Sequence, residues 1–480
     1  MLLTLQNSGD LMQTDKKILI IGGGPAGLAA TYDLAKRKIP VTCFEADSVV
    51  GGISRTVNYN GFRFDIGGHR FFSKILAVNN LWFEILGKEF LKRPRLSRIF
   101  YNGKFFYYPL QPSNALLGLG IICSLRILAS YCRARLFPSN DEQTFEQWVT
   151  NRFGAELYNV FFKTYTEKVW GIPCSEIRAE WAAQRIKGLS LWTAVVNAFF
   201  KPQKTVKTLI NEFNYPRFGP GQMYETMADK AEALGGTVEL NHRVIAVEHD
   251  GSRVTVVRVK NAAGESLIGG TDFISTMPIT ELVLAMRPVA PPEVIEAARS
   301  LRYRSLLTIN LLLNRPEQLP DTWIYVHDPS VKMGRVQFLA NWSPHMVPNQ
   351  QYSSLGLEYF CWQGDELWQT KDEELFDMGT REIERLGLAS PKDIFDGFVV
   401  RMPKCYPVYD EAYLGHINKI KNYLKIFKNL QLCGRYGLFK YNNMDHSILT
   451  ALCAVENILG ANHDVWSINA DDEYHEERKS

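Results

Sequence analysis

Residues 16–27 read KKILIIGGGPAG, and this stretch decides the fold. It opens with an uninterrupted apolar run, Ile18–Ile21, which is typical of a central parallel strand covered on both faces. Gly22, Gly24 and Gly27 then follow with the spacing G-x-G-x-x-G. This spacing provides a tight turn, a close backbone approach to a pyrophosphate, and close packing of a helix on the strand. The stretch therefore predicts the first strand, turn and helix of a dinucleotide-binding βαβ unit.

The next helix begins at Pro25 and Ala26, with proline in the first turn, where its missing N–H costs nothing. Its N-terminus is expected to point at the phosphates of the ligand. Residues 39–46 (IPVTCFEA) read as the second strand, and Glu45 lies near its end, where a carboxylate accepts ribose hydroxyls. A glycine-rich turn in an ordinary α/β protein is the alternative, but strand, glycines, helix, strand and acid occur here in register.

A second glycine pair, Gly51 and Gly52, comes directly after the acidic strand, and Arg55 follows it. This second pair resembles the FAD proteins of the amine oxidase and glutathione reductase type. We therefore expect these residues to bind FAD and not NAD.

Composition limits the class of protein. The chain has 480 residues, enough for two or three domains, and 54 Lys and Arg against 51 Asp and Glu leave a net charge of +3. No overall field favours nucleic acid. The eight cysteines form no C-x-x-C and the nine histidines no H-x-x-x-H, so we expect no disulfide framework, no metal and a reducing cytoplasm. No charge-free apolar run reaches 18 residues, so no membrane span is expected.

The order of the patterns predicts an α/β protein with a discontinuous Rossmann-type FAD-binding domain, an inserted helical domain and a mainly antiparallel substrate-binding sheet. Helical signals dominate residues 75–213, and strand-rich runs such as SLLTINLLL and SLGLEYFCW dominate residues 285–400. The expected divisions are a flexible leader (1–15), the FAD-binding domain (16–80, 214–284 and 400–463), the helical domain (81–213), the substrate-binding sheet (285–399) and a polar tail (464–480).

Two further segments are expected to reach the cofactor. A hairpin at residues 57–64, with Asn60-Gly61 as its turn, leads into DIGGHRFF at residues 65–72. Gly67, Gly68 and His69 in that segment let the backbone lie close to a flat ligand such as a flavin, unless His69 is merely a surface histidine in a turn. The strand pair at 237–247 and 254–259, which includes Val244, matches the segment that covers the adenine side in two-dinucleotide folds.

Residues 115–130 are the most apolar part of the helical segment. The run is interrupted by Arg126 and followed by Arg133 and Arg135. Packing inside a helical domain is one interpretation. Peripheral contact with a bilayer or with a lipid-linked substrate is the other.

A C-terminal motif, GRYGLFKYNNMDHSI at residues 434–448, concentrates the expected chemistry. Gly434 and Arg435 follow a strand, and an amphipathic helix is predicted to begin at Asn443, Met444 and Asp445, with Asn443 as N-cap. A helix N-terminus at the pyrimidine edge of a flavin stabilises the negative charge that reduction places there, and Arg435 would add a fixed cation. A surface salt bridge is the alternative for Arg435.

This motif resembles the flavin-binding signature of the UDP-galactopyranose mutases, and DIGGHRFF resembles their Gly-Gly-His loop. Three more segments are similar to that family: YTEKVWGIPCSEIRAEWAAQR at 165–185, LRYRSL at 301–306 and CYPVYD at 405–410. The resemblance implies that Tyr165 and Trp170 line a nucleotide pocket, and that Arg185, Arg304 and Tyr406 meet a diphosphate. Two arginines also suit a bidentate diphosphate clamp on chemical grounds. The tyrosines and Trp170 could equally be core aromatics. The expected substrate-binding residues are Tyr165, Trp170, Arg185, Arg304, Tyr406, Tyr409 and Tyr441.

The resemblance implies an FAD-dependent mutase that interconverts the pyranose and furanose forms of a nucleotide- or lipid-diphosphate sugar. N5 of the reduced flavin would attack the anomeric carbon, and the expelled diphosphate would later return. An external reductant such as NAD(P)H would prime the flavin. The residues expected at the chemistry are His69, Arg185, Arg304, Tyr406 and Arg435. The alternatives are an oxidoreductase of the protoporphyrinogen oxidase, amine oxidase or desaturase kind, and a flavin-binding protein without catalysis. The oligomeric state stays open, and the expected location is the cytoplasm or the inner face of the membrane.

Overall fold

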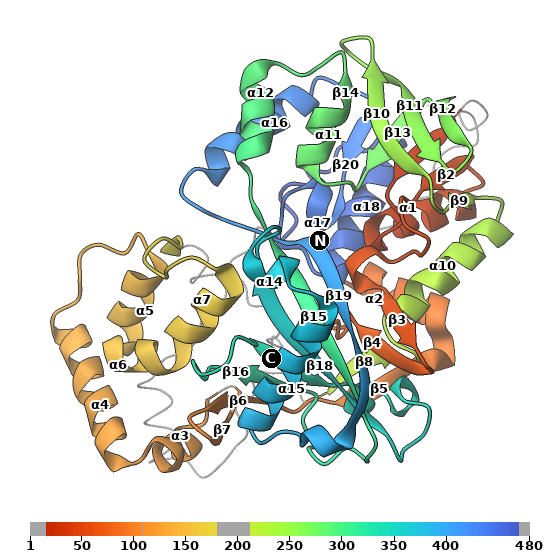
Figure 1. Ribbon diagram of the computed structural model, residues 1–480. Coiled ribbons are helices and arrows are strands. Elements are labelled where there is room, and N and C mark those ends of the chain that lie inside the picture. Colours follow the sequence, from red (N-terminus) through yellow and green to blue (C-terminus); the bar gives the residue numbers. More distant parts are fainter. Residues whose placement is uncertain (1–15, 109, 180–211, 470–480) are drawn as a thin grey trace.

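The computed structural model describes residues 16–108, 110–179 and 212–469 (Figure 1). A parallel sheet of five strands carries the glycine-rich stretch, in the order β20-β13-β1-β2-β9. Its strands are β1 (Ile18–Ile21), β2 (Val41–Phe44), β9 (Thr237–Glu239), β13 (Asp272–Ser275) and β20 (Leu430–Leu432). The predicted first strand and turn are confirmed, and β1 is central as its apolar run indicated.

Both faces of this sheet are covered, because successive side chains of a strand point to opposite faces. Ile18 and Ile20 pack into one apolar cluster with helices α1 (Pro25–Lys36), α2 (Leu76–Leu86), α10 (Gly221–Ala233) and α18 (Met444–Ile458). Leu19 and Ile21 pack into a second cluster with α11 (Ile279–Ala285), α12 (Pro292–Ser300) and α16 (Tyr413–Leu424). The sheet is therefore the middle layer of three.

A smaller sheet of four strands packs into the apolar cluster on the Leu19 and Ile21 side of the parallel sheet. Its strands are β10 (Arg243–His249), β11 (Val254–Asn261), β12 (Gly264–Gly269) and β14 (Met286–Arg287). The expected antiparallel pair is found as β10 and β11, but its first strand begins at Arg243 and not at residue 237, because Thr237–Glu239 is β9 of the parallel sheet. The register shifts between Val244 and Ala246.

A second large sheet has the order β19-β15-β18-β17-β16-β6-β7 and is antiparallel except between β16 and β6. Its strands are β6 (Ser97–Tyr101), β7 (Lys104–Tyr107), β15 (Tyr303–Leu313), β16 (Trp323–Val326), β17 (Arg335–Phe338), β18 (Ser353–Cys361) and β19 (Ile394–Pro407). Strand β19 continues past residue 399, where the substrate-binding sheet was expected to end.

Strands β6 and β7 lie inside the range 81–213 that was expected to be helical. They form a hairpin at Asn102 and Gly103, whose φ angles of 48° and 72° are those of a tight hairpin turn. The strand β5 (Phe90–Pro94) also lies in that range, and it pairs with β8 (Glu212–Pro216) at the end of the range. The parallel pairing of β6 with β16 ties this part of the chain to the second large sheet.

Strand β7 is an edge of that sheet, and Asn114 covers it. The Asn114 carboxamide oxygen accepts the N–H of Tyr107 at 2.9 Å, and its amide nitrogen donates to the carbonyl of Phe105 at 3.4 Å. Lys104 Nζ donates to the carbonyl of Gly118 at 2.7 Å. The helix that begins at Pro112 is therefore bonded to the outer strand through side chains.

The helices of this part lie at the lower left of Figure 1, away from the parallel sheet. They are α3 (Pro112–Leu119), α4 (Ile121–Leu136), α5 (Phe145–Phe153), α6 (Ala155–Tyr158), a π-helical turn (Asn159–Lys163) and α7 (Thr164–Trp170). The remaining helices are α13 (Leu339–Trp342), α14 (Glu366–Gln369), α15 (Asp372–Arg385) and α17 (Gly434–Gly437). Within the described residues, every helix is too short or too polar to cross a bilayer.

The expected hairpin at 57–64 is confirmed as β3 (Thr56–Tyr59) and β4 (Phe62–Asp65). Strand β4 ends at Asp65, whose carboxylate accepts a 2.6 Å hydrogen bond from the hydroxyl of Tyr215. Both side chains are buried, and burial raises the pKa of Asp65 to about 8.

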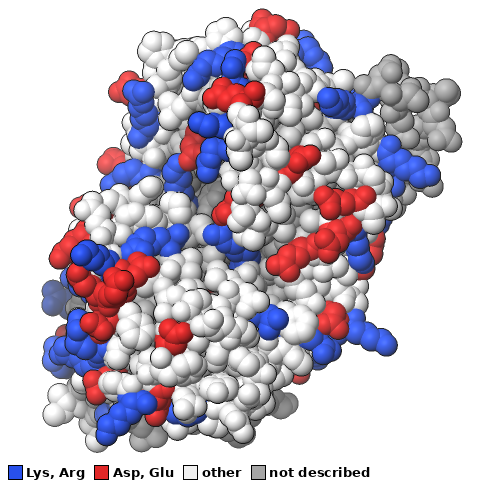
Figure 2. Space-filling view, turned by 45° about the vertical axis from the view of Figure 1, so that its right-hand side comes forward, with Lys and Arg blue, Asp and Glu red and all other residues white. Residues whose placement is uncertain are grey.

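Basic and acidic side chains are mixed over the face of the molecule in Figure 2.

Candidate active site

A cavity of about 1100 Å³ lies where the parallel sheet, the second large sheet and the helices meet. Most of the residues expected at the site line it, although they come from all parts of the chain. The expected residues that line the cavity are Gly22, Gly24, Pro25, Ala26, Glu45, Gly52, Gly67, Gly68, His69, Tyr165, Trp170, Val244, Tyr406, Tyr409, Gly434, Arg435, Tyr441, Asn443, Met444 and Asp445.

The three glycines of the first turn differ in what surrounds them. A Cβ atom on Gly22 would lie 2.3 Å from Thr276 Oγ1, and one on Gly27 would lie 1.8 Å from the carbonyl oxygen of Gly22. A Cβ atom on Gly24 would meet no protein atom within 4 Å. Gly22 and Gly27 therefore serve packing, and Gly24 leaves open the place where a ligand can approach the backbone.

The second glycine pair, Gly51 and Gly52, is hydrogen-bonded to the first glycine-rich turn. The N–H of Gly51 donates to the carbonyl of Gly23 at 2.9 Å, and Gly51 has a φ of +97°, a conformation that favours glycine. Glu45 connects the first turn to the end of β2, because its carboxylate accepts hydrogen bonds from the N–H groups of Gly23 at 2.7 Å and Asp47 at 2.8 Å. Gly27, Gly51 and Arg55 do not line the cavity themselves, and Arg55 pairs with Asp47.

His69 lies at the wall of the cavity as a neutral imidazole. Its Nδ1 is 3.0 Å from the carbonyl oxygen of Gly67, so Nδ1 carries the proton and Nε2 is left as an acceptor. Burial lowers the pKa of His69 to about 4, and the charges of Arg435 and Arg335 add to this effect.

Arg435 contributes a fixed cation. Its Nε donates to the carbonyl of Cys405 at 2.7 Å and its Nη1 to that of Asn442 at 3.2 Å. The guanidinium lies 4.2 Å from the ring centre of Tyr441 and 5.1 Å from that of Tyr406. Among the described residues no acid pairs with it, so Arg435 presents a positive charge to the cavity.

The N-terminus of α18 faces the same space. Asn443 is its N-cap, as predicted, and its N–H donates to His446 Nδ1 at 3.4 Å. Asn443, Met444 and Asp445 all line the cavity. The partial positive charge of a helix N-terminus therefore adds to that of Arg435.

Arg304, which was expected at a diphosphate, does not line the cavity. Its guanidinium donates to the carbonyls of Phe360 at 2.7 Å, Val169 at 3.2 Å and Lys168 at 3.3 Å. Two of these carbonyls belong to the last turn of α7, which attracts a cation. Arg304 thus fixes α7 to the second large sheet, and its contact with a diphosphate stays a prediction. Arg185 lies outside the described residues.

Arg335 was missed. It lines the cavity from β17 and forms a two-pronged ion pair with Glu358 of β18, whose side chain is fully buried. Gln337 also donates to Glu358, at 2.5 Å. The only sequence signal is Glu358 itself, a carboxylate inside the apolar run LGLEYF, which needs a buried partner.

Aromatic side chains form a further part of the wall. Tyr165 stacks on His327 with ring centres 5.0 Å apart and planes at 7°, and Tyr406 stacks on Tyr441 at 5.7 Å and 23°. His327 is buried, and burial lowers its pKa to about 3, so it is neutral. Beyond Tyr165 the lining is apolar, with Phe145, Phe153, Leu157, Phe161 and Phe162.

A parallel sheet with two joined glycine loops, an acid at the second strand and a helix N-terminus at a large cavity is typical of dinucleotide-binding folds. A family described as flavin containing amine oxidoreductase matches residues 25–459, so the chain belongs to that family. The predicted α/β class and the resemblance to the mutases within this superfamily are confirmed.

Proteins similar to this chain include both mutases and a desaturase. A crystal structure of reduced UDP-galactopyranose mutase has a TM-score of 0.83, with 22% identity, over 95% of this chain and 97% of that one. A probable UDP-galactopyranose mutase of Klebsiella pneumoniae is 27% identical over 34% of this chain and 44% of its own length. A 4,4'-diapophytoene desaturase of Methylomonas sp. is 33% identical over 19% of each chain. The match therefore spans less than half the length of either curated relative.

Proposed function

We propose that this flavoenzyme holds FAD and isomerises a diphosphate sugar between its pyranose and furanose forms. The observation that carries the proposal is Arg435, a partly buried cation on the cavity wall that lies beside the stacked rings of Tyr406 and Tyr441 and has no acidic partner among the described residues. A guanidinium in this setting favours a polyanion beside a flat ring system. The family membership supports the flavin, and the fold match supports the mutase-like reaction.

The residues present fit the cofactor. The space above Gly24 and the N-terminus of α1 suit the pyrophosphate, and Glu45 suits the ribose. His69, Gly67 and Gly68 would lie along the flavin, with the N-terminus of α18 at its pyrimidine edge. Reduced flavin, when bound, supplies a nucleophile for the anomeric carbon of the sugar.

The chain's own residues would handle the leaving diphosphate. Arg435 and the hydroxyls of Tyr406 and Tyr441 would hold it near the sugar, so that its return is faster than its loss to water. The Arg335–Glu358 pair gives this wall a fixed geometry, because each side chain is bonded to the other at two points. Neutral His69 would offer Nε2 as an acceptor to a sugar or flavin proton donor.

The test uses the purified yellow protein, reduced with dithionite without air and offered UDP-galactofuranose and other nucleotide sugars. We expect interconversion only in the reduced state and no oxygen uptake. Arg435→Met should lose at least tenfold in turnover, because a charge-assisted contact is worth about 1.5–3 kcal/mol. Arg302→Met is the matched control, since Arg302 is half exposed and paired with Asp410.

An oxidoreductase is the second candidate. The apolar lining beyond Tyr165 and the match to a desaturase favour an apolar substrate that loses hydrogen. Oxygen consumption or dye reduction driven by a substrate, without sugar interconversion, would support this candidate and contradict the isomerase.

A further inference from the structure

The outer face of helix α4 is apolar and open to solvent. Ile121 and Ile122 are 80% and 79% exposed, Leu125 is 60% exposed and Leu136 is 72% exposed. Leu117, just before the helix, and Phe137, just after it, are exposed as well. A run of large apolar side chains in water along one helix marks an interaction surface.

These residues are not the packing face of the helix. α4 buries Ile127 and Tyr131, which are one turn apart, against the helices behind it. Ile121, Leu125, Leu128 and Leu136 recur at helical spacing on another side. α4 therefore has two apolar sides, and only one of them is used within the described residues.

Arginines flank the exposed apolar stripe. At 100° per residue, Arg133 and Arg135 project on opposite sides of a stripe centred on Leu125 and Cys132. Both arginines are exposed, and neither forms an ion pair within the part of the chain that the structure describes. Arg126, in the same helix, is paired with Glu156. The stripe thus has a positive rim.

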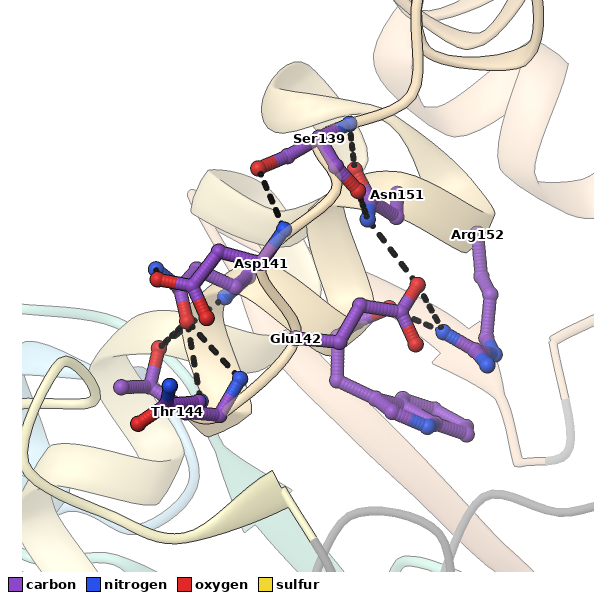
Figure 3. Close-up of polar contacts among 9 residues, drawn as sticks. Ser139, Asp141, Glu142, Thr144, Asn151 and Arg152 are labelled. Carbon is purple, nitrogen blue, oxygen red and sulfur yellow. Dashed lines mark hydrogen bonds and ion pairs between the residues drawn. The ribbon is translucent and has the colours of Figure 1, made fainter.

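The nearest acids along the chain are engaged elsewhere. Glu142 accepts hydrogen bonds from Asn151 and Arg152 in the last turn of α5 (Figure 3), and Asp141 accepts one from Gln147 in its first turn. Thr144 caps the same helix. These acids therefore do not neutralise the rim of α4.

We propose that α4 docks this protein on an anionic lipid bilayer, with the helix lying in the plane of the interface. An apolar stripe with arginines on both sides is the pattern of an interfacial helix, because its side chains enter the acyl boundary while the cations meet anionic headgroups. The helix has 16 residues and is about 24 Å long, too short to span. It also lies at the outer end of the molecule, away from the parallel sheet (Figure 1).

Charge argues for a bilayer over a second copy of the chain. A symmetric dimer through α4 would place the same stripe and the same arginines on both partners. Helix α4 has no Asp or Glu, so a second copy of it would bring further arginines and no acid to this interface, which opposes association. Anionic headgroups are complementary to this rim. The proposal holds for either reaction discussed above.

The first test is co-sedimentation of the full chain with phosphatidylcholine vesicles, with and without phosphatidylglycerol. The wild type should sediment with the anionic vesicles, and Leu125→Glu should reduce partition by about tenfold or more. Leu267→Glu on β12 is the matched control, because Leu267 is 57% exposed and lies on another sheet. Equal partition of both variants would overturn the proposal.

Charge is tested separately. The double variant Arg133→Glu/Arg135→Glu should lose about tenfold or more in partition to anionic vesicles, since each cation near such a surface is worth about 1 kcal/mol. Arg381→Glu/Arg385→Glu on α15 is the control with the same charge change. Failure of the wild-type protein to sediment with anionic vesicles would refute the proposal.

A polarity-sensitive dye can report directly whether the exposed side of α4 enters lipid. Cys132 is exposed within the stripe, and Cys123 is half-buried, so a polarity-sensitive dye on Cys132 in a Cys123→Ser background samples this surface. Its emission should shift to the blue when anionic vesicles are added. An unchanged emission, or a dimer in sedimentation equilibrium that Leu125→Glu dissolves, would overturn the bilayer as the occupant.

Discussion

Two alanine substitutions in the first glycine turn should separate folding from cofactor binding. In Gly27→Ala the new methyl group would lie 1.8 Å from the carbonyl oxygen of Gly22. In Gly24→Ala it would meet no protein atom within 4 Å. We expect Gly27→Ala to lose stability, and Gly24→Ala to fold normally and lose affinity for the flavin.

The magnitudes follow from these distances. A Cβ atom is essentially never closer than 3.0 Å to another heavy atom, so Gly27→Ala must separate two backbones by at least 1.2 Å, the difference between 3.0 and 1.8 Å. Helix α1 is packed into a closed core, and overpacking of this kind costs about 3 kcal/mol. Gly24 has φ −77° and ψ −172°, which alanine adopts freely, so its cost stays within about 1 kcal/mol.

The assay measures unfolding of flavin-free protein in urea and, separately, flavin binding by absorbance and fluorescence. Gly24→Ala should bind at least tenfold more weakly, a loss of about 1.4 kcal/mol, because its methyl group occupies the approach to the pyrophosphate. Wild-type affinity in Gly24→Ala would refute the assignment of this turn to the cofactor. A fully stable Gly27→Ala would refute the packing argument.

Three other substitutions test buried charges. Glu358→Gln should cost about 3 kcal/mol in urea unfolding, because it leaves Arg335 uncompensated in a buried pair; no loss would contradict that pairing. His327 has a lowered pKa of about 3 in the folded protein, so its imidazole binds a proton at a higher pH in the unfolded chain than in the folded one. The free energy of unfolding therefore falls by about 1.5 kcal/mol as the pH is lowered from 6.5 to 5. His327→Phe should remove that part of the slope in thermal unfolding. Asp65 has a raised pKa of about 8, so its contribution to the free energy of unfolding falls by roughly 4 kcal/mol from pH 5 to 8. Asp65→Asn should abolish this decline, which urea titrations at several pH values would reveal.

The half of the molecule that carries the parallel sheet could be predicted because its signals are local. The spacing of Gly22, Gly24 and Gly27, the Asn60-Gly61 turn and the cap at Asn443 each depend on a few neighbouring residues. The β6–β7 hairpin carried such a signal too, since Asn102-Gly103 lies between RIFY and KFFY. It was assigned to a helical region because helical patterns surround it on both sides.

The cavity wall formed by the second large sheet could not be predicted in the same way, because strand pairing brings together residues that are distant in sequence. Arg335 faces the cavity only because β17 pairs with β18 and places Glu358 beside it. Arg304 belongs to a segment that resembles the mutases, yet the exposed carbonyls at the end of α7 take its guanidinium. Sequence similarity indicates which residue is present, and the competing acceptors decide where its side chain lies.

Asn114 has a consequence for solubility. The outer strand of a broad sheet offers unused amide and carbonyl groups, and a strand from another molecule could pair with them and start an aggregate. The Asn114 carboxamide takes one group of each kind, on Tyr107 and Phe105, as a neighbouring strand would. One side chain thus ends the hydrogen-bond ladder, and the chain can carry a seven-stranded sheet without offering β7 as a template for growth.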